Sequence, residues 1–406
     1  MELRTDVDRV LERAVDGGEV SGVTAAAGDE AGVFYEGAYG KRAAGGQTPM
    51  TVDTVFWIAS MTKAITSVAA LQQVELGKLS LDDPLGEVLP ELNEIKVLEG
   101  FDSKGTPKLR KPKRPITLRH LLTHTAGFTY DIWSADMVRY QEHAGIPGII
   151  ECRNVTLMTP LLFDPGERWN YGINLDWAGK AVEKVSGERL EGYFHDHIFN
   201  RLGMKDTSFA LRPDQRSRLA TMHARQPDAT LAPIEFEMAQ DPEFYMGGGG
   251  LYSTAGDYLT FLRMLLNAGT LDGAQILSAG TVAEMNRNQI GDLLVTKLKS
   301  AIPASSNDAE FLPGMSKKWG LGHQINAEES HTGRSADSLA WGGLGNTYYW
   351  LDPRKRVVGV ICTQILPFAD EKVLDLSAGF ERAIYDRMRP NYVLEPDGGS
   401  GRPVKP

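Results

Sequence analysis

Runs of residues typical of β-strands stand near both ends of this 406-residue chain. Near the N-terminus, residues 20–27 and 33–39 flank the turn-like segment 28–32, which predicts a hairpin. Near the C-terminus, residues 347–351 and 357–364 flank a second turn, at 352–355. Helical patterns lie outside both hairpins, up to about residue 17 and from about 370 to 389. We therefore expect an α+β fold with one antiparallel sheet, built from both ends of the chain and flanked by helices.

The middle of the chain predicts a different organisation. Residues 82–202 show mostly helical patterns broken by loops, including 117–125, 176–185 and 190–199. This predicts a helical domain at 82–202 and an α/β domain formed by residues 1–81 and 203–390. The basic segment 104–114 is interrupted by Pro and Gly, which favours a solvated loop. The end, 391–406, is rich in Pro and Gly and is expected to be a flexible tail.

Charge and composition exclude several classes of partner. The net charge is -10, so nucleic acid and an anionic membrane surface would both repel the chain. The first residues lack a basic and an apolar region, and no apolar run approaches membrane-spanning length, so we expect a cytoplasmic protein. The two cysteines form no C-x-x-C pattern and no disulfide framework. The oligomeric state, a homo-oligomer included, is left open.

The segment Ser60-Met61-Thr62-Lys63 is the strongest indication of chemistry. An apolar run precedes it, and a helical pattern follows to a stop at Gly77, so Ser60 is predicted to be the helix N-cap. Residues three apart share a helix face, which places the Lys63 amine beside the Ser60 hydroxyl as a base beside a nucleophile. An S-x-x-K also arises by chance about once in a chain of this length. The alternative is an ordinary capped helix with a solvated lysine.

Tyr171 is the best candidate for a third catalytic group. It follows the turn Asp164-Pro165-Gly166 and precedes a helix predicted to begin near Asn174. A phenol beside a lysine ammonium can ionise well below its ordinary pKa of about 10, and would then serve as a base. The alternative is a packed aromatic side chain at a helix start.

Other sequence patterns give weaker evidence of function. No G-x-S-x-G is present, which excludes the nucleophile elbow of α/β-hydrolases. His120 and His124 are four apart, but nothing nearby completes a metal site, so core or capping histidines are favoured. The glycines at 247–250 match no phosphate-binding loop and indicate a close backbone approach.

With these residues in view, the chain resembles the serine β-lactamase and penicillin-binding-protein-like superfamily, closest to class C and to the family VIII carboxylesterases. The matches follow the family's order over about residues 10–388. They are residues 56–63 around Ser60 and Lys63, 121–127, the Tyr171 loop, 202–207, 248–257, and Trp341-Gly342-Gly343. The resemblance implies an active site between the α/β and helical domains.

The resemblance also implies roles. Ser60 would be the acylated nucleophile, Lys63 its partner, and Tyr171 the group that activates Ser60 and then the deacylating water. The backbone N–H groups of Ser60 and Leu344 would form the oxyanion hole. Substrate contacts would come from Trp341, Gly342, Gly343 and Asn174, with no metal and no cofactor.

Two positions depart from the lactamase pattern. Ile173 stands two residues after Tyr171, where the family often has Asn or Ser, and Asn174 follows one place later. Trp341 stands where lactamases carry the Lys or His that pairs with a substrate carboxylate, as in the esterase branch. His331-Thr332-Gly333 matches that lactamase motif literally, but its polar surroundings favour a loop.

These observations predict a cofactor-free serine hydrolase that forms an acyl-enzyme. Its expected activity is that of a carboxylesterase on uncharged small-molecule esters with short-to-medium or aromatic acyl groups. A transacylase, or a β-lactam or amide hydrolase using the same site, is the alternative within enzymes. A non-catalytic scaffold of the same fold is the alternative from another class.

Overall fold

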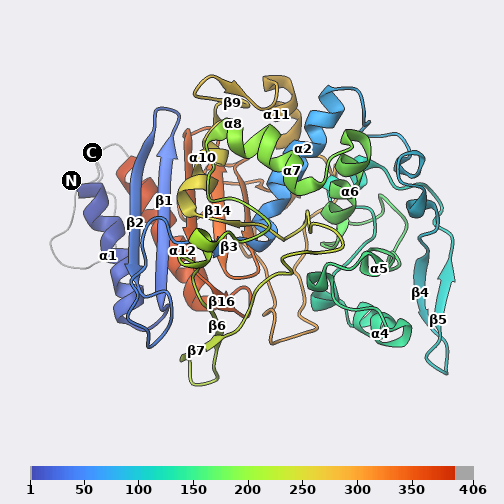
Figure 1. Cartoon of the computed structure of the whole chain (residues 1–406), viewed down its shortest axis with the longest axis horizontal. Coiled ribbons are helices and arrows are strands. Elements are labelled where there is room, and N and C mark those ends of the chain that lie inside the picture. Colours follow the sequence, from blue (N-terminus) through green and yellow to red (C-terminus); the bar gives the residue numbers. More distant parts are fainter. Residues whose placement is uncertain (1, 389–406) are drawn as a thin grey trace.

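A seven-stranded antiparallel sheet is the largest element of the computed structural model, which describes residues 2–388. Its strands come from the two ends of the chain (Figure 1). In spatial order they are β11 (Lys317–Trp319), β12 (Gln324–Asn326), β13 (Leu339–Gly343), β14 (Thr347–Asp352), β15 (Val357–Cys362), β1 (Gly22–Asp29) and β2 (Val33–Gly40).

The pairing of β15 with β1 joins the two ends of the chain. Thr24 lies opposite Cys362 and Asp29 opposite Val357, in antiparallel register. Both predicted hairpins are present, β1–β2 with a register shift at Ala27/Gly28 and β14–β15 without one. Strands β14 and β15 are buried along their whole length, as expected for strands covered on both faces. The α+β class expected from the sequence is confirmed.

Helices cover both faces of this sheet (Figure 1). On one face lies α10 (Ala255–Leu266), whose Tyr258 ring packs against Tyr349 of β14 at 5.2 Å between centroids. On the other lie α1 (Glu2–Asp16) and α12 (Glu371–Met388), where Phe380 packs against Trp350 at 5.3 Å. Adjacent residues of β14 thus point to opposite faces, as strand geometry requires.

Residues 82–202 contain short helices separated by loops, together with one hairpin, and the division into domains at 82 and 202 stays a prediction. The remaining elements are α3 (Leu118–Leu122), α4 (Ala135–Ala144), α5 (Asn154–Leu157), α6 (Asn174–Ser186), α7 (Leu190–Phe194), α8 (Asn200–Leu202), α9 (Pro213–Arg216), α11 (Ala279–Asn286), and the small sheets β3 (Phe56–Trp57) with β8 (Tyr252–Ser253), β9 (Thr270–Leu271) with β10 (Ala274–Gln275), and β6 (Met222–Arg225) with β7 (Leu231–Ile234) and β16 (Ile365–Leu366). The predicted tail at 391–406 lies outside the described residues.

The basic segment 104–114 is not a plain loop. It contributes β5 (Pro107–Arg110), which pairs with β4 (Val97–Phe101) in a hairpin. Arg110 donates two hydrogen bonds of 2.8 Å to the buried carboxylate of Asp164, which also accepts from the Lys113 backbone at 2.8 Å. This ion pair holds the segment against the body of the protein. The Pro and Gly residues, from which a solvated loop was predicted, gave no indication of it.

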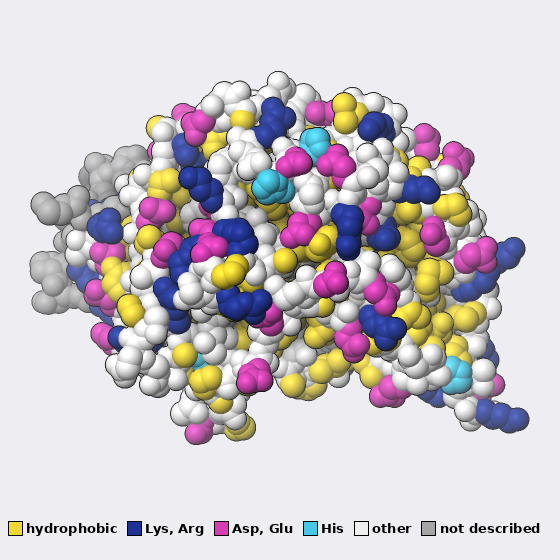
Figure 2. Space-filling model, viewed as in Figure 1, with side chains coloured by type: hydrophobic (Ala, Val, Ile, Leu, Met, Phe, Trp, Pro, Cys, Tyr) yellow, Lys and Arg dark blue, Asp and Glu magenta, His cyan; other side chains and the backbone are white. Residues whose placement is uncertain are grey.

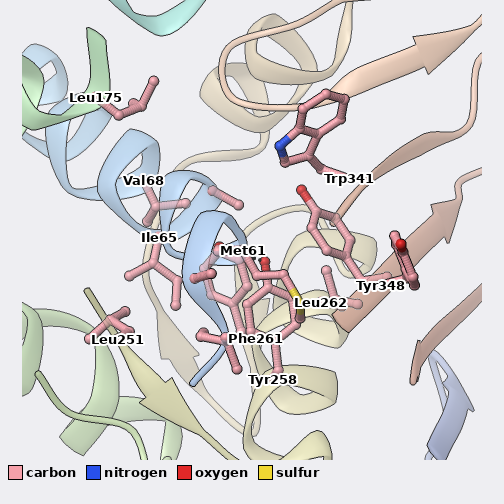
Figure 3. Packing of buried hydrophobic residues seen from close by; sticks show 14 of the residues in the cluster. Met61, Ile65, Val68, Leu175, Leu251, Tyr258, Phe261, Leu262, Trp341 and Tyr348 are labelled. Atoms are coloured by element: carbon pink, nitrogen blue, oxygen red, sulfur yellow. Dashed lines mark hydrogen bonds between the residues drawn. The ribbon is translucent and has the colours of Figure 1, made fainter. Parts of the chain in front are cut away.

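Helix α2 (Thr62–Glu75) lies in the centre of the molecule and is buried on all sides from Thr62 to Gln73. Figure 3 shows Met61 and Ile65 directed toward Tyr258, Phe261 and Leu262 of α10. The Tyr258 hydroxyl donates to the Met61 carbonyl at 2.8 Å, which fixes the start of α2 against α10. Gly77 follows the helix with a φ of 67°, in the left-handed region that favours glycine, so the predicted stop is confirmed.

The surface seen in Figure 2 carries Lys and Arg interleaved with Asp and Glu, without a broad patch of one sign on that face. Within residues 2–388, no helix is long and apolar enough to cross a membrane.

Candidate active site

Ser60 lies in a short 3₁₀ turn, η1 (Ala59–Met61), immediately before α2. The prediction that Ser60 is the N-cap of α2 is wrong, because Met61 holds that position and no side chain caps the helix. Ala59 has a φ of 43°, an uncommon conformation for a residue with a side chain. The end of β13 passes close by: a Cβ added at Gly343 would lie 2.2 Å from the Ile58 carbonyl oxygen. The turn that carries Ser60 is therefore fixed by tight packing.

Lys63 is fully buried, and its amine has three hydrogen-bond partners. Nζ lies 3.1 Å from Ser60 Oγ, 3.0 Å from the Tyr130 hydroxyl and 2.5 Å from the Gly248 carbonyl oxygen. The contact between Lys63 and Ser60 confirms that spacing of three brings the two groups together. A solvated lysine, the alternative reading of the motif, is excluded.

The charge state of Lys63 is set by burial and by Asp176. Burial lowers the pKa of Lys63 to about 7, and the Asp176 carboxylate acts in the opposite direction. Burial also raises the pKa of Asp176, to about 6. Asp176 Oδ1 accepts from the Gly248 N–H at 2.8 Å, while Oδ2 has no partner among the described residues. A lysine that titrates near neutral pH can accept the proton of a serine hydroxyl.

We expect the Asp176→Asn substitution to move the acidic limb of the kcat/KM profile to lower pH. The carboxylate favours protonated Lys63, so its removal lowers the pKa of Lys63 further and leaves the amine neutral at lower pH. Asparagine retains an oxygen for the Gly248 N–H. The measurement is ester hydrolysis from pH 5 to 9, with Asp164→Asn as a control, since buried Asp164 pairs with Arg110. A limb that stays in place or moves upward would contradict this electrostatic role.

Tyr171 is buried beside Lys63, whose Nζ lies 4.6 Å from the centre of the phenol ring. The expectation that lysine lowers the tyrosine pKa is wrong. Burial raises the pKa of Tyr171 above its ordinary value, although hydrogen bonds with Ser60 and Trp341 oppose this effect. The amine lies over the ring, and the hydroxyl instead accepts from Trp341 Nε1 at 2.9 Å. At neutral pH Tyr171 is therefore a protonated phenol, which can donate a proton, and not a phenolate.

A second tyrosine, Tyr130, was not anticipated from the sequence. Its hydroxyl contacts Lys63, and its ring lies 5.4 Å from that of Tyr171. Burial raises the pKa of Tyr130 well above its ordinary value, and Asp176 adds to this. Tyr130 stands three residues after the matched segment 121–127, but a lone tyrosine in a loop gives no indication that it will meet residue 63.

Ser60 opens into a small pocket with apolar walls and a cavity volume of about 30 Å³. No charged side chain lines it, and Tyr130 supplies a polar hydroxyl. The walls come from three parts of the chain: Trp57, Ala59 and Ser60; Tyr130, Ile132, Trp133, Ile149 and Ile150; and Met246, Gly249 and Leu344. Leu344 therefore borders the same pocket as Ser60, where the family resemblance implies the oxyanion hole.

The four residues predicted to contact the substrate are not among those that line the Ser60 pocket. Trp341 packs behind Tyr171 and is 4% exposed, so it orients that hydroxyl rather than lining the pocket. Gly342 and Gly343 belong to β13 and are not among the lining residues. Asn174 is fully buried, and its carboxamide contacts His124 Nδ1 at 2.9 Å. Asn174 has no exposed surface to offer a substrate and is not among the residues that line the pocket.

The histidines have structural partners. His120 Nδ1 accepts from the Thr117 backbone in a capping box, and His124 packs against Tyr171 at 4.6 Å between ring centres. Within residues 2–388, no group of three or more His, Cys, Asp and Glu residues could hold a metal ion. His331 lies in a loop, as predicted, and does not line the Ser60 pocket.

The glycine segment 247–250 approaches the site through its backbone, as predicted. A Cβ at Gly248 would lie 2.8 Å from Asp176 Oδ2 and 2.9 Å from the Tyr130 hydroxyl, so only glycine fits. The Trp57 indole donates to the Gly249 carbonyl at 2.7 Å and fixes the same segment from the other side.

Comparison with known proteins places this geometry in a family. The beta-lactamase family model matches residues 7–383. The chain belongs to the beta-lactamase family. It is 34% identical over 394 residues to a lovastatin esterase of Penicillium rubens, covering 93% of this chain and 98% of the relative. It is 35% identical over 350 residues to a monacolin J acid methylbutanoyltransferase of Aspergillus terreus, covering 83% of each.

Solved structures agree. A simvastatin synthase mutant from Aspergillus terreus superposes with a TM-score of 0.80 at 31% identity, covering 94% of each chain. A hydrolase described as having promiscuous acyltransferase activity shares the fold, with a TM-score of 0.75 at 24% identity over 94% and 98% of the two chains. This beta-lactamase family member is thus an enzyme of the esterase and acyltransferase group, and the predicted superfamily is confirmed.

Proposed function

We propose that this beta-lactamase family protein is a carboxylesterase that hydrolyses uncharged esters with small acyl groups through an acyl-enzyme on Ser60. The contact of 3.1 Å between Lys63 Nζ and Ser60 Oγ carries the proposal, because it joins a nucleophile to a buried amine. The amine is held by the Gly248 carbonyl and the Tyr130 hydroxyl, so it is directed at the serine.

The proton path follows from these positions. Lys63 takes the Ser60 proton as Oγ attacks the ester carbonyl, and Tyr171, hydrogen-bonded to Ser60, delivers a proton to the departing alkoxide. The backbone N–H groups of Ser60 and Leu344 stabilise the oxyanion. In deacylation, the Tyr171 phenolate left by this step takes the proton of the attacking water, and the Lys63 ammonium returns its proton to Ser60 Oγ as the acyl group leaves.

The substrate class follows from the pocket walls. No lysine or arginine lines the pocket, so a substrate carboxylate would lose its hydration without gaining a partner. The small apolar cavity favours acyl groups of a few carbons over long chains. The methylbutanoyl group in the name of one relative is a short branched acyl group of this kind.

Hydrolysis of p-nitrophenyl acetate, butyrate and octanoate tests the proposal. We expect the two short esters to be turned over, octanoate to react more slowly, and nitrocefin to be cleaved little. The Ser60→Ala variant should lose at least about 10³-fold in kcat/KM. Ser67→Ala is the matched control, since Ser67 is a buried serine of α2 whose hydroxyl has no partner among the described residues.

Covalent labelling separates the enzyme from a scaffold. A fluorophosphonate should add one label to the wild type and to Ser67→Ala, and none to Ser60→Ala, as measured by intact mass. Ester turnover that persists in Ser60→Ala would remove the proposed nucleophile. A wild type that neither reacts with the label nor hydrolyses esters would favour the scaffold.

Acyl transfer to an alcohol is the second candidate. It is favoured by the apolar walls of the pocket, which suit the apolar body of an alcohol, and by a transferase among relatives at 35% identity. The test adds cyclohexanol to p-nitrophenyl butyrate and measures cyclohexyl butyrate and butyrate by mass spectrometry. More cyclohexyl ester than free acid would make the protein a transferase, and free acid alone would make it a hydrolase.

A further inference from the structure

Met246 differs in kind from the other side chains that line the pocket at Ser60. Among the described residues of this lining, Met246 alone has a long unbranched side chain, and the others are aromatic, branched or small. A methionine side chain fills irregular space and changes its rotamer more readily than a branched or aromatic one. Met246 is therefore the part of the wall that can most easily change the size of the pocket.

The thioether end of Met246 lies beside the turn that carries the nucleophile. A Cβ added at Gly249 would lie 3.1 Å from Met246 Cε, 3.5 Å from its Sδ, and 3.8 Å from the carbonyl carbon of Ala59. The Met246 methyl and the Ala59 carbonyl thus meet above Gly249, which has no side chain to separate them. The end of Met246 is therefore close to Ser60, the residue after Ala59.

The backbone around Met246 is held in place by hydrogen bonds. The Met246 carbonyl accepts from the N–H groups of Gly249 at 3.0 Å and Gly250 at 2.8 Å. Thr66 of α2 donates to the Gly247 carbonyl at 2.6 Å. Because the backbone is fixed at these points, the space at this end of the pocket is set by the Met246 side chain.

The pocket has a buried end and an open end. Trp57 and Ala59, which are neighbours of Gly249, are buried, and Met246 lies with them at 5% exposed. At the other end, Ile150 is 44% exposed and Trp133 is half-buried. A chain that extends from Ser60 into the buried end meets Met246.

Tyr171 indicates which half of an ester faces the buried end. In the proposed mechanism Tyr171 delivers a proton to the departing alkoxide, so the alcohol half must lie on the side of Tyr171. The Tyr171 ring packs against Trp133, at the open end, with 5.5 Å between ring centroids. The alcohol half therefore lies toward the open end, and the acyl half points toward Met246.

We propose that Met246 limits the length of the acyl group that Ser60 accepts, by closing the buried end of the pocket. Short acyl groups fit in front of the Met246 methyl, whereas longer ones reach the methyl and must displace it. The proposal rests on the function proposed above, because it takes Ser60 as the acylated residue and Tyr171 as the proton donor.

The first measurement is the ratio of kcat/KM for p-nitrophenyl octanoate to kcat/KM for the butyrate. We expect Met246→Ala, which removes three heavy atoms, to raise this ratio at least about tenfold over the wild type. Met246→Leu, which conserves the side-chain volume, should change it by less than about threefold. Met285→Ala is the matched control and should leave the ratio unchanged, because Met285 is a buried methionine of α11 that does not line the pocket.

Gly249→Ala tests the same end of the pocket in the opposite direction, and serves if Met246→Ala does not fold. The φ of Gly249 lies outside the region that favours glycine, so alanine is compatible with the backbone. Its methyl would press on Met246 Cε and narrow the buried end, which should lower kcat/KM for butyrate relative to acetate about tenfold. Adding Met246→Ala to this variant should return the ratio toward that of the wild type.

A binding measurement separates this proposal from the proposed catalysis. In Ser60→Ala, octanamide is an unreactive probe, and the ¹⁵N indole resonances of Trp57 and Trp133 report its binding at the pocket. Adding Met246→Ala should raise the affinity for octanamide at least about tenfold.

The two readouts fail for different reasons. If the wild type hydrolyses esters, an octanoate-to-butyrate ratio that does not rise in Met246→Ala, or that rises equally in Met285→Ala, overturns the role of Met246. If the wild type is inert toward esters, the proposed function fails and the octanamide affinity decides. A rise on adding Met246→Ala then supports Met246 as the limit on ligand length, and no rise overturns it.

Discussion

Replacing Lys63 by methionine is expected to lower kcat/KM for p-nitrophenyl butyrate by about 10²- to 10⁴-fold, the usual contribution of a general base. Methionine matches the length of lysine but cannot accept the Ser60 proton. It also leaves the Gly248 carbonyl and the Tyr130 hydroxyl without their buried partner. Rates are to be measured above pH 7, where the amine of the wild type is neutral.

Lys78→Met is the matched control, because Lys78 is an exposed lysine just beyond the same helix. It should keep the wild-type rate. Circular dichroism melting curves establish whether Lys63→Met is folded at the assay temperature. A folded Lys63→Met protein with activity within tenfold of wild type would show that another group accepts the serine proton.

The two buried tyrosines are expected to respond differently to loss of their hydroxyls. Tyr171→Phe should lower kcat/KM by about 10²-fold or more, because the Tyr171 hydroxyl is hydrogen-bonded to Ser60 and would carry the proton to the leaving group. Tyr130→Phe should cost less than about tenfold, because its hydroxyl contacts Lys63 and not Ser60. The comparison removes one oxygen atom at each of two neighbouring rings.

Esters with different leaving groups test the proposed role of Tyr171 more specifically. p-Nitrophenolate needs little protonation, whereas an ethyl ester releases a strongly basic alkoxide. The loss in Tyr171→Phe should therefore be greater for ethyl butyrate than for p-nitrophenyl butyrate, and the loss in Tyr130→Phe should be the same for both. Equal losses for the two esters in Tyr171→Phe would assign that tyrosine a packing role.

The sequence identified the parts of the site that are close together along the chain. Ser60 and Lys63 are three residues apart, and the 3₁₀ turn that runs into α2 brings them into contact. Likewise, both hairpins follow from turns between short strands, and the sheet follows from strands at both ends of the chain. These features depend on local backbone geometry and on alternation of apolar residues, which the order of residues records directly.

The tertiary structure decided which distant groups surround Lys63. Tyr130 and Gly248 are 67 and 185 residues away, and no local pattern marks them. In the first turn of α6, the Asp176 carboxylate raises the pKa of Lys63, while the Asn174 carboxamide contacts His124. The rotation of the helix against its neighbours decides which side chain faces which group. Burial then fixed the proton chemistry, since the removal of water lowers the pKa of Lys63 and raises that of Tyr171. A sequence lists the groups that can ionise, but only packing decides which of them lose their hydration and which charges they face.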